Sequence, residues 1–304
     1  MSSVLLVDQG LKVELHADDL GATAGVNDGI LSAWHKGGVD GVSVLANGDA
    51  VDAAAAEVNR HPEVPLRIVA HLNLSEARCV SSPSGIPLLI NENGQLSRGF
   101  VGLWLLWLKS NNEAKQVLLE QVTAEWRAQI SRVQQAFAPR KVDALDGHIH
   151  VHMLPFTFPV AVKLAKEFGV GQIRISSEVR HFSLKDSLRF SYLVNIIKHQ
   201  LLRFLAGPAR RLAANSGLES PDAVAGLLYS GRMSRATIEA AAAAARRKGY
   251  ESLEVICHPG RATSEEQQRW NGQPGLAGFY LSPDRDFERQ TLIELGDARS
   301  SLRS

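Results

Sequence analysis

Short apolar runs alternate with longer stretches of helical periodicity along most of this 304-residue chain. The runs that predict strands lie at 12–17, 41–46, 66–71, 144–150, 172–176, 225–228 and 252–257. The predicted helices lie at 26–35, 50–60, 113–138, 158–168, 234–248 and 287–295. Short strands joined by crossover helices are typical of a parallel sheet. Because one α/β barrel commonly reaches this length, we expect a single domain over 1–304.

Two segments, near 75–110 and 180–220, interrupt the alternation of predicted strands and helices. Residues 75–99 carry the turn signals SSPSG and NENG, which predict a long irregular loop. In a compact domain such a loop is usually a lid or a binding loop. We therefore expect insertions in the domain near 75–110 and 180–220.

The composition excludes several protein classes. Hydrophobic residues make up 45% of the chain and charged residues 21%, as in an ordinary soluble globular protein. The formal net charge of +1 gives no basic field for nucleic acid, so no nucleic-acid partner is expected. The two cysteines lie far apart in the sequence, which favours unpaired thiols in a reducing compartment. The first eight residues lack the pattern of a signal peptide, so we expect a cytoplasmic protein.

Polar side chains gather at the ends of the predicted strands. In parallel α/β folds the carboxyl ends of the strands meet at one rim, where sites are built. The residues placed there are Asp18, Asp19, Asn47, His71, His148 and His258.

The strongest single motif is Asp-Gly-His-Ile-His-Val-His at 146–152. In an extended strand, alternate side chains share a face, so the imidazoles of His148, His150 and His152 would point the same way. Three histidines at this spacing beside Asp146 favour a metal or catalytic role over a polar core ladder. Some of them would orient ligands or contact substrate.

Asp18 and Asp19 form an adjacent pair of carboxylates. Such a pair is costly to bury unless a cation lies close, so one could bind a divalent ion while the other takes a proton from water. A helix N-cap is the structural alternative. His71 is a plausible third ligand, and His258, before a Pro-Gly turn, could protonate a leaving amine.

Arg174 and Glu178 follow the histidine motif and could form a buried ion pair or bind a polar substrate. Cys257 would face away from His258, so a Cys-His nucleophile is not expected. The chain contains no GxGxxG, P-loop or GxSxG motif.

Taken together, the motifs resemble the YdjC-like (ChbG/HpnK) family of carbohydrate deacetylases, which includes chitooligosaccharide deacetylases and HpnK-type enzymes of hopanoid lipid synthesis. The elements occur in the family's order: ADDLG at 17–21, VNDGI at 26–30, SVLANG at 43–48, HLNL at 71–74, DGHIHVH at 146–152, Arg174 with Glu178, GRM at 231–233 and CHPG at 257–260. The chain departs from the family at Leu20, where Phe is usual, and this change concerns local packing only.

The resemblance implies a distorted (β/α) TIM-like barrel, seven-stranded, with one divalent ion, zinc or magnesium. Asp19, His71 and His148 would be the metal ligands. Asp18 would be the base, and His258 the acid that protonates the leaving group.

The implied reaction removes N-acetyl groups from an amino sugar and releases acetate. The sugar would belong to an oligosaccharide or to a lipid-linked glycan, with a hopanoid-type glycolipid as one form. The residues expected to bind this substrate or to support the ligands are Asn47, Asp146, His150, His152, Arg174 and Glu178.

Residues 185–212 read as a basic amphipathic helix, and residues 100–108 form a second apolar patch with two tryptophans. Both patterns favour peripheral contact with the inner face of a membrane. The alternative is that these segments pack on the barrel or across a homodimer interface.

Two other functions remain open. An amidohydrolase-type barrel also uses His-x-His at a strand end, but there the pair normally lies on the first strand, and here it follows three strands. A catalytically inactive sugar-binding barrel is the second alternative, although every proposed catalytic residue type is present. Metal analysis would separate an enzyme from an inactive barrel.

Overall fold

The fold was obtained as a computed structural model, which describes residues 10–181 and 190–301. Its centre is a sheet of seven parallel strands in the order β5-β4-β3-β2-β1-β7-β6. The strands are β1 Lys12–Leu20, β2 Gly41–Val44, β3 Arg67–Leu72, β4 Ala144–Gly147, β5 Gln172–Ile173, β6 Ala223–Ala225 and β7 Ser252–Cys257.

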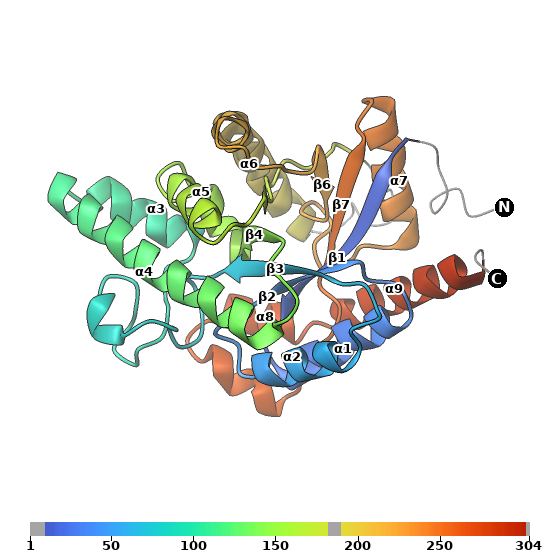
Figure 1. The fold of residues 1–304 in the computed structure, drawn as a ribbon, viewed down its shortest axis with the longest axis horizontal. Helices are drawn as coiled ribbons and strands as arrows, with labels where there is room; N and C mark the ends of the chain where they lie inside the picture. Colours follow the sequence, from blue (N-terminus) through green and yellow to red (C-terminus); the bar gives the residue numbers. More distant parts are fainter. Residues whose placement is uncertain (1–9, 182–189, 302–304) are drawn as a thin grey trace.

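The sheet curls until its two edge strands approach each other (Figure 1). The Ile173 amide donates to the Glu219 carbonyl at 2.9 Å, and the Val179 amide donates to the Val224 carbonyl at 3.0 Å. These bonds join the β5 edge to the β6 edge. The prediction of a distorted, seven-stranded (β/α) barrel is therefore confirmed for the described residues.

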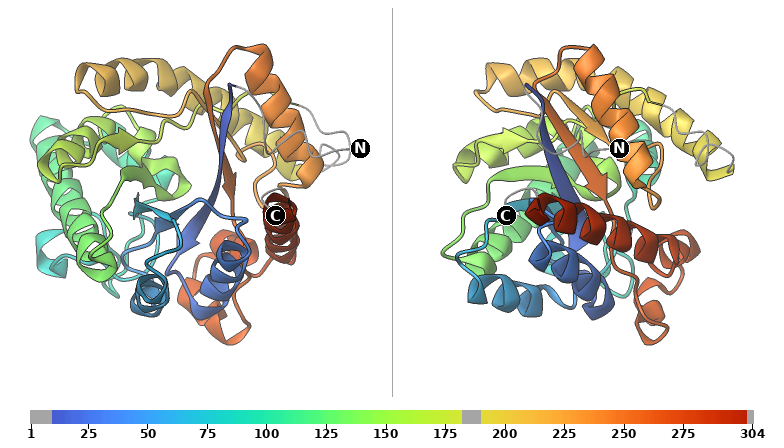
Figure 2. Two further views of the ribbon diagram at one scale, coloured as in Figure 1. Left: turned by 45° about the vertical axis from the view of Figure 1, so that its right-hand side comes forward. Right: turned by 90° about the vertical axis from the view of Figure 1, so that its right-hand side faces the viewer.

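Helices surround the sheet, as the stretches of helical periodicity predict (Figure 2). They bury large side chains such as Trp34, Trp126 and Phe137 against the outer face of the strands. Several begin at capping side chains, for example Thr23, whose hydroxyl accepts from the Val26 amide. The main surrounding helices are α1 Ala24–His35, α2 Val51–Arg60, α4 Asn112–Phe137, α5 Phe158–Glu167, α7 Arg235–Arg247 and α9 Asp284–Ser301.

The two segments expected as insertions contain helices. Residues 75–99 are irregular except for the 3₁₀ turn η1 Pro83–Gly85, and α3 Phe100–Lys109 follows them. Helix α6 Phe190–Asn215 contains residues 190–212 of the basic helix expected at 185–212, and residues 185–189 lie outside the described residues. Within the described residues, every helix is too short or too polar to cross a bilayer. The remaining elements are η2 His148–Met153, η3 Glu265–Trp270 and α8 Pro274–Tyr280.

Several predicted strands were wrong in their bounds. The first runs on to Leu20, the second ends at Val44 and the fifth ends at Ile173. Two further differences have a cause in the backbone. The strand expected at 144–150 ends at Gly147, because Ile149 and His150 have positive φ angles of 44° and 62° and the chain turns into η2. The strand expected at 225–228 lies at 223–225, and Gly226, with φ of 123°, ends it.

The interior of the barrel is polar, whereas barrel interiors are usually filled by branched apolar residues. His16 and Ser43 are completely buried inside, and Glu254 is 3% exposed. The His16 imidazole lies 2.8 Å from the Ser43 hydroxyl. Because buried charges need partners, this interior depends on a connected set of hydrogen bonds and ion pairs.

Candidate active site

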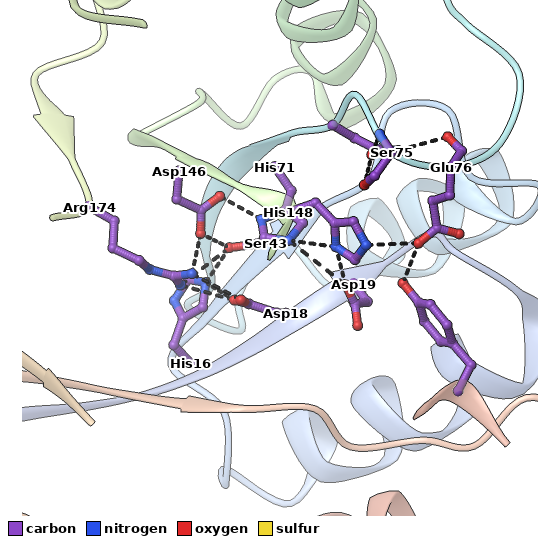
Figure 3. A network of polar contacts seen from close by, with 12 residues as sticks. His16, Asp18, Asp19, Ser43, His71, Ser75, Glu76, Asp146, His148 and Arg174 are labelled. Atoms are coloured by element: carbon purple, nitrogen blue, oxygen red, sulfur yellow. Dashed lines mark hydrogen bonds and ion pairs between the residues drawn. The ribbon is translucent and has the colours of Figure 1, made fainter. Parts of the chain in front are cut away.

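The end of β1 carries the two adjacent acids. Its pairing with β2 shifts register between Ala17 and Leu20, and Asp19 has a φ of 76°. In a regular strand two adjacent side chains would face opposite sides. The left-handed residue changes that direction, and Asp is among the residues that tolerate it best. Asp18 and Asp19, 4% and 1% exposed, therefore both reach the same buried site (Figure 3).

Three side chains converge there on one point. Asp19 Oδ1 lies 3.2 Å from His148 Nδ1 and 3.8 Å from His71 Nε2, and the two imidazole nitrogens are 3.3 Å apart. Asp19 Oδ1 is buried and has no hydrogen-bond partner among the described residues. One carboxylate and two imidazoles form a donor set for zinc or another divalent ion. The residues present therefore fit a divalent cation, and they are the three that the family resemblance implies.

A carboxylate orients each of these histidines. His71 Nδ1 lies 2.7 Å from Asp146 Oδ1, and His148 Nε2 lies 2.8 Å from Glu76 Oε1. This arrangement turns the other nitrogen of each ring toward Asp19, as carboxylate–histidine pairs do at metal sites. Burial alone would lower the pKa of His148, but Asp19 and Glu76 raise it to about 10. The same negative field favours a cation at this point.

Sequence reasoning missed Glu76, which is completely buried. Trp270 Nε1 donates to its Oε2 at 2.6 Å, and the Tyr280 hydroxyl donates to its Oε1 at 3.0 Å. Burial would raise the pKa of Glu76, but the contact with His148 lowers it. The one available signal was an acidic residue shortly after His71, inside the loop expected to bind substrate.

We expect Glu76→Gln to lower metal affinity about 10- to 100-fold, the usual cost of losing a carboxylate behind a histidine ligand. Competition with a coloured chelator measures this affinity. Glu92→Gln is the matched control, because Glu92 is exposed in the same loop. Equal affinity in the two variants would contradict the assigned role of Glu76.

Arg174 holds Asp18. Its two terminal nitrogens donate to the two carboxylate oxygens of Asp18 at 3.0 Å each. It also pairs with Asp146 and Glu254. Burial alone would raise the pKa of Asp18, but Arg174 and neighbouring histidines hold it well below its usual range. Asp18 is therefore ionised at neutral pH. The buried ion pair expected of Arg174 exists, but its partners are these three acids and Glu178 is not among them.

Arg285 contacts the other carboxylate oxygen of Asp19, Oδ2. Sequence reasoning did not identify Arg285 either. Both of its terminal nitrogens lie 3.3 Å from Asp19 Oδ2, and its Nε donates to the Gly260 carbonyl at 2.6 Å. Its guanidinium lies over the rings of Tyr280 and Phe279, at 4.7 and 5.0 Å from their centroids. Arg285 thus fixes the Asp19 carboxylate and leaves Oδ1 directed at the histidines.

His258 lies just past β7, at the same end of the barrel. Burial lowers its pKa to about 4, although the charges of Asp19 and Asp18 oppose that shift. Its Nδ1 is buried and has no hydrogen-bond partner among the described residues. The Phe279 ring packs edge-on against it, with centroids 5.1 Å apart. His258 is therefore an unprotonated imidazole at neutral pH.

Glu288 fixes the backbone beside this histidine. Its carboxylate accepts from the His258 amide at 2.5 Å and from the Met233 amide at 2.7 Å. Burial raises its pKa to about 7, from an ordinary value of 4.5.

This pKa makes stability depend on pH. Between about pH 4.5 and 7 the folded chain holds the Glu288 proton and the unfolded chain does not, so stability falls as the pH rises, by up to about 3 kcal/mol. We expect Glu288→Gln to flatten this dependence, measured by urea unfolding from pH 5 to pH 8. Glu294→Gln, exposed on the same helix, should keep the wild-type slope. Equal slopes in wild type and Glu288→Gln would refute the raised pKa.

The other histidines of the motif do not form the shared face expected from the sequence. His148 points at Asp19, whereas His152 Nε2 donates to the Arg174 carbonyl at 2.9 Å. His150 is half-buried, and its Nδ1 lies 3.0 Å from the Ser176 hydroxyl. The turn after Gly147 separates the three rings. In this structure His152 therefore supports the backbone of Arg174.

The two remaining expected residues have structural contacts. Asn47 donates to the carbonyls of Glu76 and Arg78 at 2.9 and 3.0 Å, so it supports the segment that carries Glu76. Glu178 accepts from three consecutive amides at 226–228, at 2.8 to 3.2 Å. Glu178 therefore fixes the turn after β6.

Comparison with known proteins finds a matching family and several similar proteins. The sequence model of the family described as "YdjC-like protein" matches residues 12–294. A chitooligosaccharide deacetylase from Serratia marcescens is 27% identical over 245 residues, covering 81% of this chain and 80% of that protein. A carbohydrate deacetylase from Oceanobacillus iheyensis is 32% identical over 160 residues, covering 53% of this chain and 63% of that protein.

Among solved structures, a candidate cellobiose-phosphate cleavage protein from Enterococcus faecalis V583 has the same fold. Its TM-score is 0.68 at 22% identity, covering 96% of this chain and 95% of that one. The family model spans nearly the whole barrel and includes every residue of the buried cluster. The chain therefore belongs to the YdjC-like protein family.

Proposed function

We propose that this protein is a metal-dependent hydrolase that removes N-acetyl groups from amino sugars and releases acetate. The observation that carries the proposal is the buried cluster of Asp19, His71 and His148 beside an Asp18 carboxylate held by Arg174. Relatives named as chitooligosaccharide and carbohydrate deacetylases support the reaction class. We propose zinc or magnesium as the ion, and an oligosaccharide or a lipid-linked glycan, such as a hopanoid-type glycolipid, as the carrier of the sugar.

The ligands would be Asp19, His71 and His148, with Asp146 and Glu76 behind the two histidines. When bound there, a divalent ion supplies Lewis acidity to the acetyl carbonyl and lowers the pKa of a water molecule. The protein's part is to aim both histidines at one point and to shield them from solvent.

Asp18 and His258 would move the proton. Asp18 is ionised, so it can accept the proton that the attacking water loses. His258 is unprotonated at neutral pH, so it can receive that proton and pass it to the departing nitrogen. Over the whole reaction, one water molecule is consumed and the C–N bond breaks. Acetate and the protonated amino sugar are formed.

A substrate panel tests the proposal and its alternatives. Acetate and free amine would be measured for N-acetylated oligosaccharides, N-acetylated glycolipids and N-acetylated amino acids. We expect release from a sugar substrate, with equal amounts of acetate and amine. Release from the amino acids alone would favour an amidohydrolase-type activity. Sugar binding without any release, in protein with its metal bound, would favour the inactive barrel.

A further inference from the structure

Most of the large apolar side chains exposed on the described chain lie on the histidine turn η2 and on the two helices that contact it. Helices α3 and α6 both pack against η2, and they lie on the same side of the barrel (Figure 1). Six of the eight exposed large hydrophobic residues of the described chain belong to these three elements: Val101, Leu105, Leu108, Ile149, Ile197 and Phe204. We call these six residues and the elements that carry them the docking face. Apolar residues that are exposed by chance are scattered singly over a surface, whereas these six share three neighbouring elements.

Helix α3 is the clearest part of the docking face. Eight of its ten residues are apolar, yet Leu103 alone is buried. Val101, Leu105 and Leu108 form an exposed stripe at helical spacing, 48–67% exposed. A helix that is apolar all round is normally covered, by a protein core or by lipid. Beside it, an open groove of about 1030 Å³ is lined by side chains of α3, α4, α5 and the segment before α5. Its lining combines apolar residues such as Trp107 and Phe156 with two cations and one acid, Arg127, Lys163 and Glu120.

The charges of the docking face decide what covers it. Neither α3 nor α6 contains an Asp or Glu, whereas Lys109, Lys198 and Arg211 are exposed on them. The Lys115 ammonium lies 5.2 Å above the Trp107 ring. Tryptophans beside cations are typical of helices that lie in the interface of an anionic bilayer. A helix of ten residues is about 15 Å long, so α3 would lie along the membrane surface.

We propose that α3, η2 and α6 form a docking face for an anionic lipid bilayer. A second copy of this chain fits the face less well, because a twofold contact would join two faces whose helices α3 and α6 carry exposed cations and no Asp or Glu. The docking is a property of the surface and goes beyond the proposed deacetylation. It would place the end of the barrel that carries His148 close to lipid headgroups.

Vesicle flotation with the full-length protein tests the proposal. Phosphatidylcholine vesicles with and without phosphatidylglycerol would be compared at low and high salt. We expect binding at least about tenfold tighter with phosphatidylglycerol, and weaker at high salt, since each cation near such a surface contributes about fivefold. Lys198→Glu/Arg211→Glu should lower binding to the anionic vesicles by at least about tenfold.

The apolar contact is tested separately. Leu105→Glu/Leu108→Glu should lower binding by at least about tenfold, because two leucines no longer enter the interface. Phe287→Glu is the matched control, since Phe287 is 39% exposed on α9 and should leave binding unchanged. Circular dichroism checks that each variant is folded.

Acetate release from a soluble N-acetylated oligosaccharide keeps the two proposals distinct. The Leu105→Glu/Leu108→Glu variant should retain this activity, so its loss of lipid binding would concern docking alone. Wild-type protein that binds neither kind of vesicle would overturn the docking face. A stable dimer in light scattering that Leu105→Glu/Leu108→Glu converts to monomer would also overturn it, because a second copy would then cover the face.

Discussion

Asp18→Asn should lower acetate release by about 10²- to 10⁴-fold while the protein keeps its metal. Positioned general bases contribute rate factors of this size. The amide has nearly the volume of the carboxylate, and Arg174 keeps Asp146 and Glu254 as partners, so the fold should persist. The rate of acetate release and the metal content, measured on the same sample, together test this expectation.

The matched control for this substitution is Asp28→Asn. Asp28 belongs to the motif at 26–30, but its side chain is exposed. The Asp28→Asn variant should therefore retain full activity. If Asp18→Asn kept more than about a tenth of the wild-type rate with its metal bound, Asp18 would not be the base, since even a weak general base contributes more than that.

His71→Ala should remove both the metal and the activity. It deletes one of three ligands and leaves Asp146 without its histidine partner. A site with two remaining protein ligands binds zinc-like ions poorly, so elemental analysis should find little metal per chain. Acetate release should fall at least about 10³-fold, because both the Lewis acid and the activated water are lost.

His150→Ala is the control for the metal measurement. His150 belongs to the same motif, but its Nδ1 faces Ser176 and it is not part of the cluster. It should keep a full equivalent of metal. A full equivalent in His71→Ala would mean that the ion binds elsewhere.

The strands and helices of the parallel sheet were predictable because their signals are local, whereas the distorted seven-stranded barrel was implied by the family resemblance. Apolar runs such as 252–257 and the intervening amphipathic stretches mark strands and crossover helices without knowledge of their neighbours. The meeting of Asp19, His71 and His148 at one rim was likewise predictable, because parallel strands end there and the polar residues at these ends lie close together. Their role as the ligand set was implied by the family resemblance.

The rest of the site depends on contacts between distant segments. Glu76 matters because of Trp270 and Tyr280, which lie 194 and 204 residues away in sequence. Arg285 contacts Asp19 across 266 residues. Nothing in the local pattern around Glu76 or Arg285 indicates these partners.

The prediction of a strand through the histidine motif was wrong for a different reason. Alternating histidines suit a strand, so the period-two pattern predicts a strand there. The positive φ angles at Ile149 and His150 contradict that local preference. Non-glycine residues rarely adopt such angles, and when they do, the surrounding structure holds them there, often at functional sites. Here the turn directs His148 to Asp19 and His152 to the Arg174 carbonyl.

The most direct test of the central claim is acetate release from an N-acetylated amino sugar during metal reconstitution. The protein is stripped with a chelator and titrated with zinc or magnesium while bound metal and acetate are measured together. We predict negligible release without metal and a rate that rises in proportion to occupancy, reaching its maximum at one ion per chain. Undiminished release from the stripped protein, or no release from any such sugar at full occupancy, would contradict a metal-dependent sugar deacetylase.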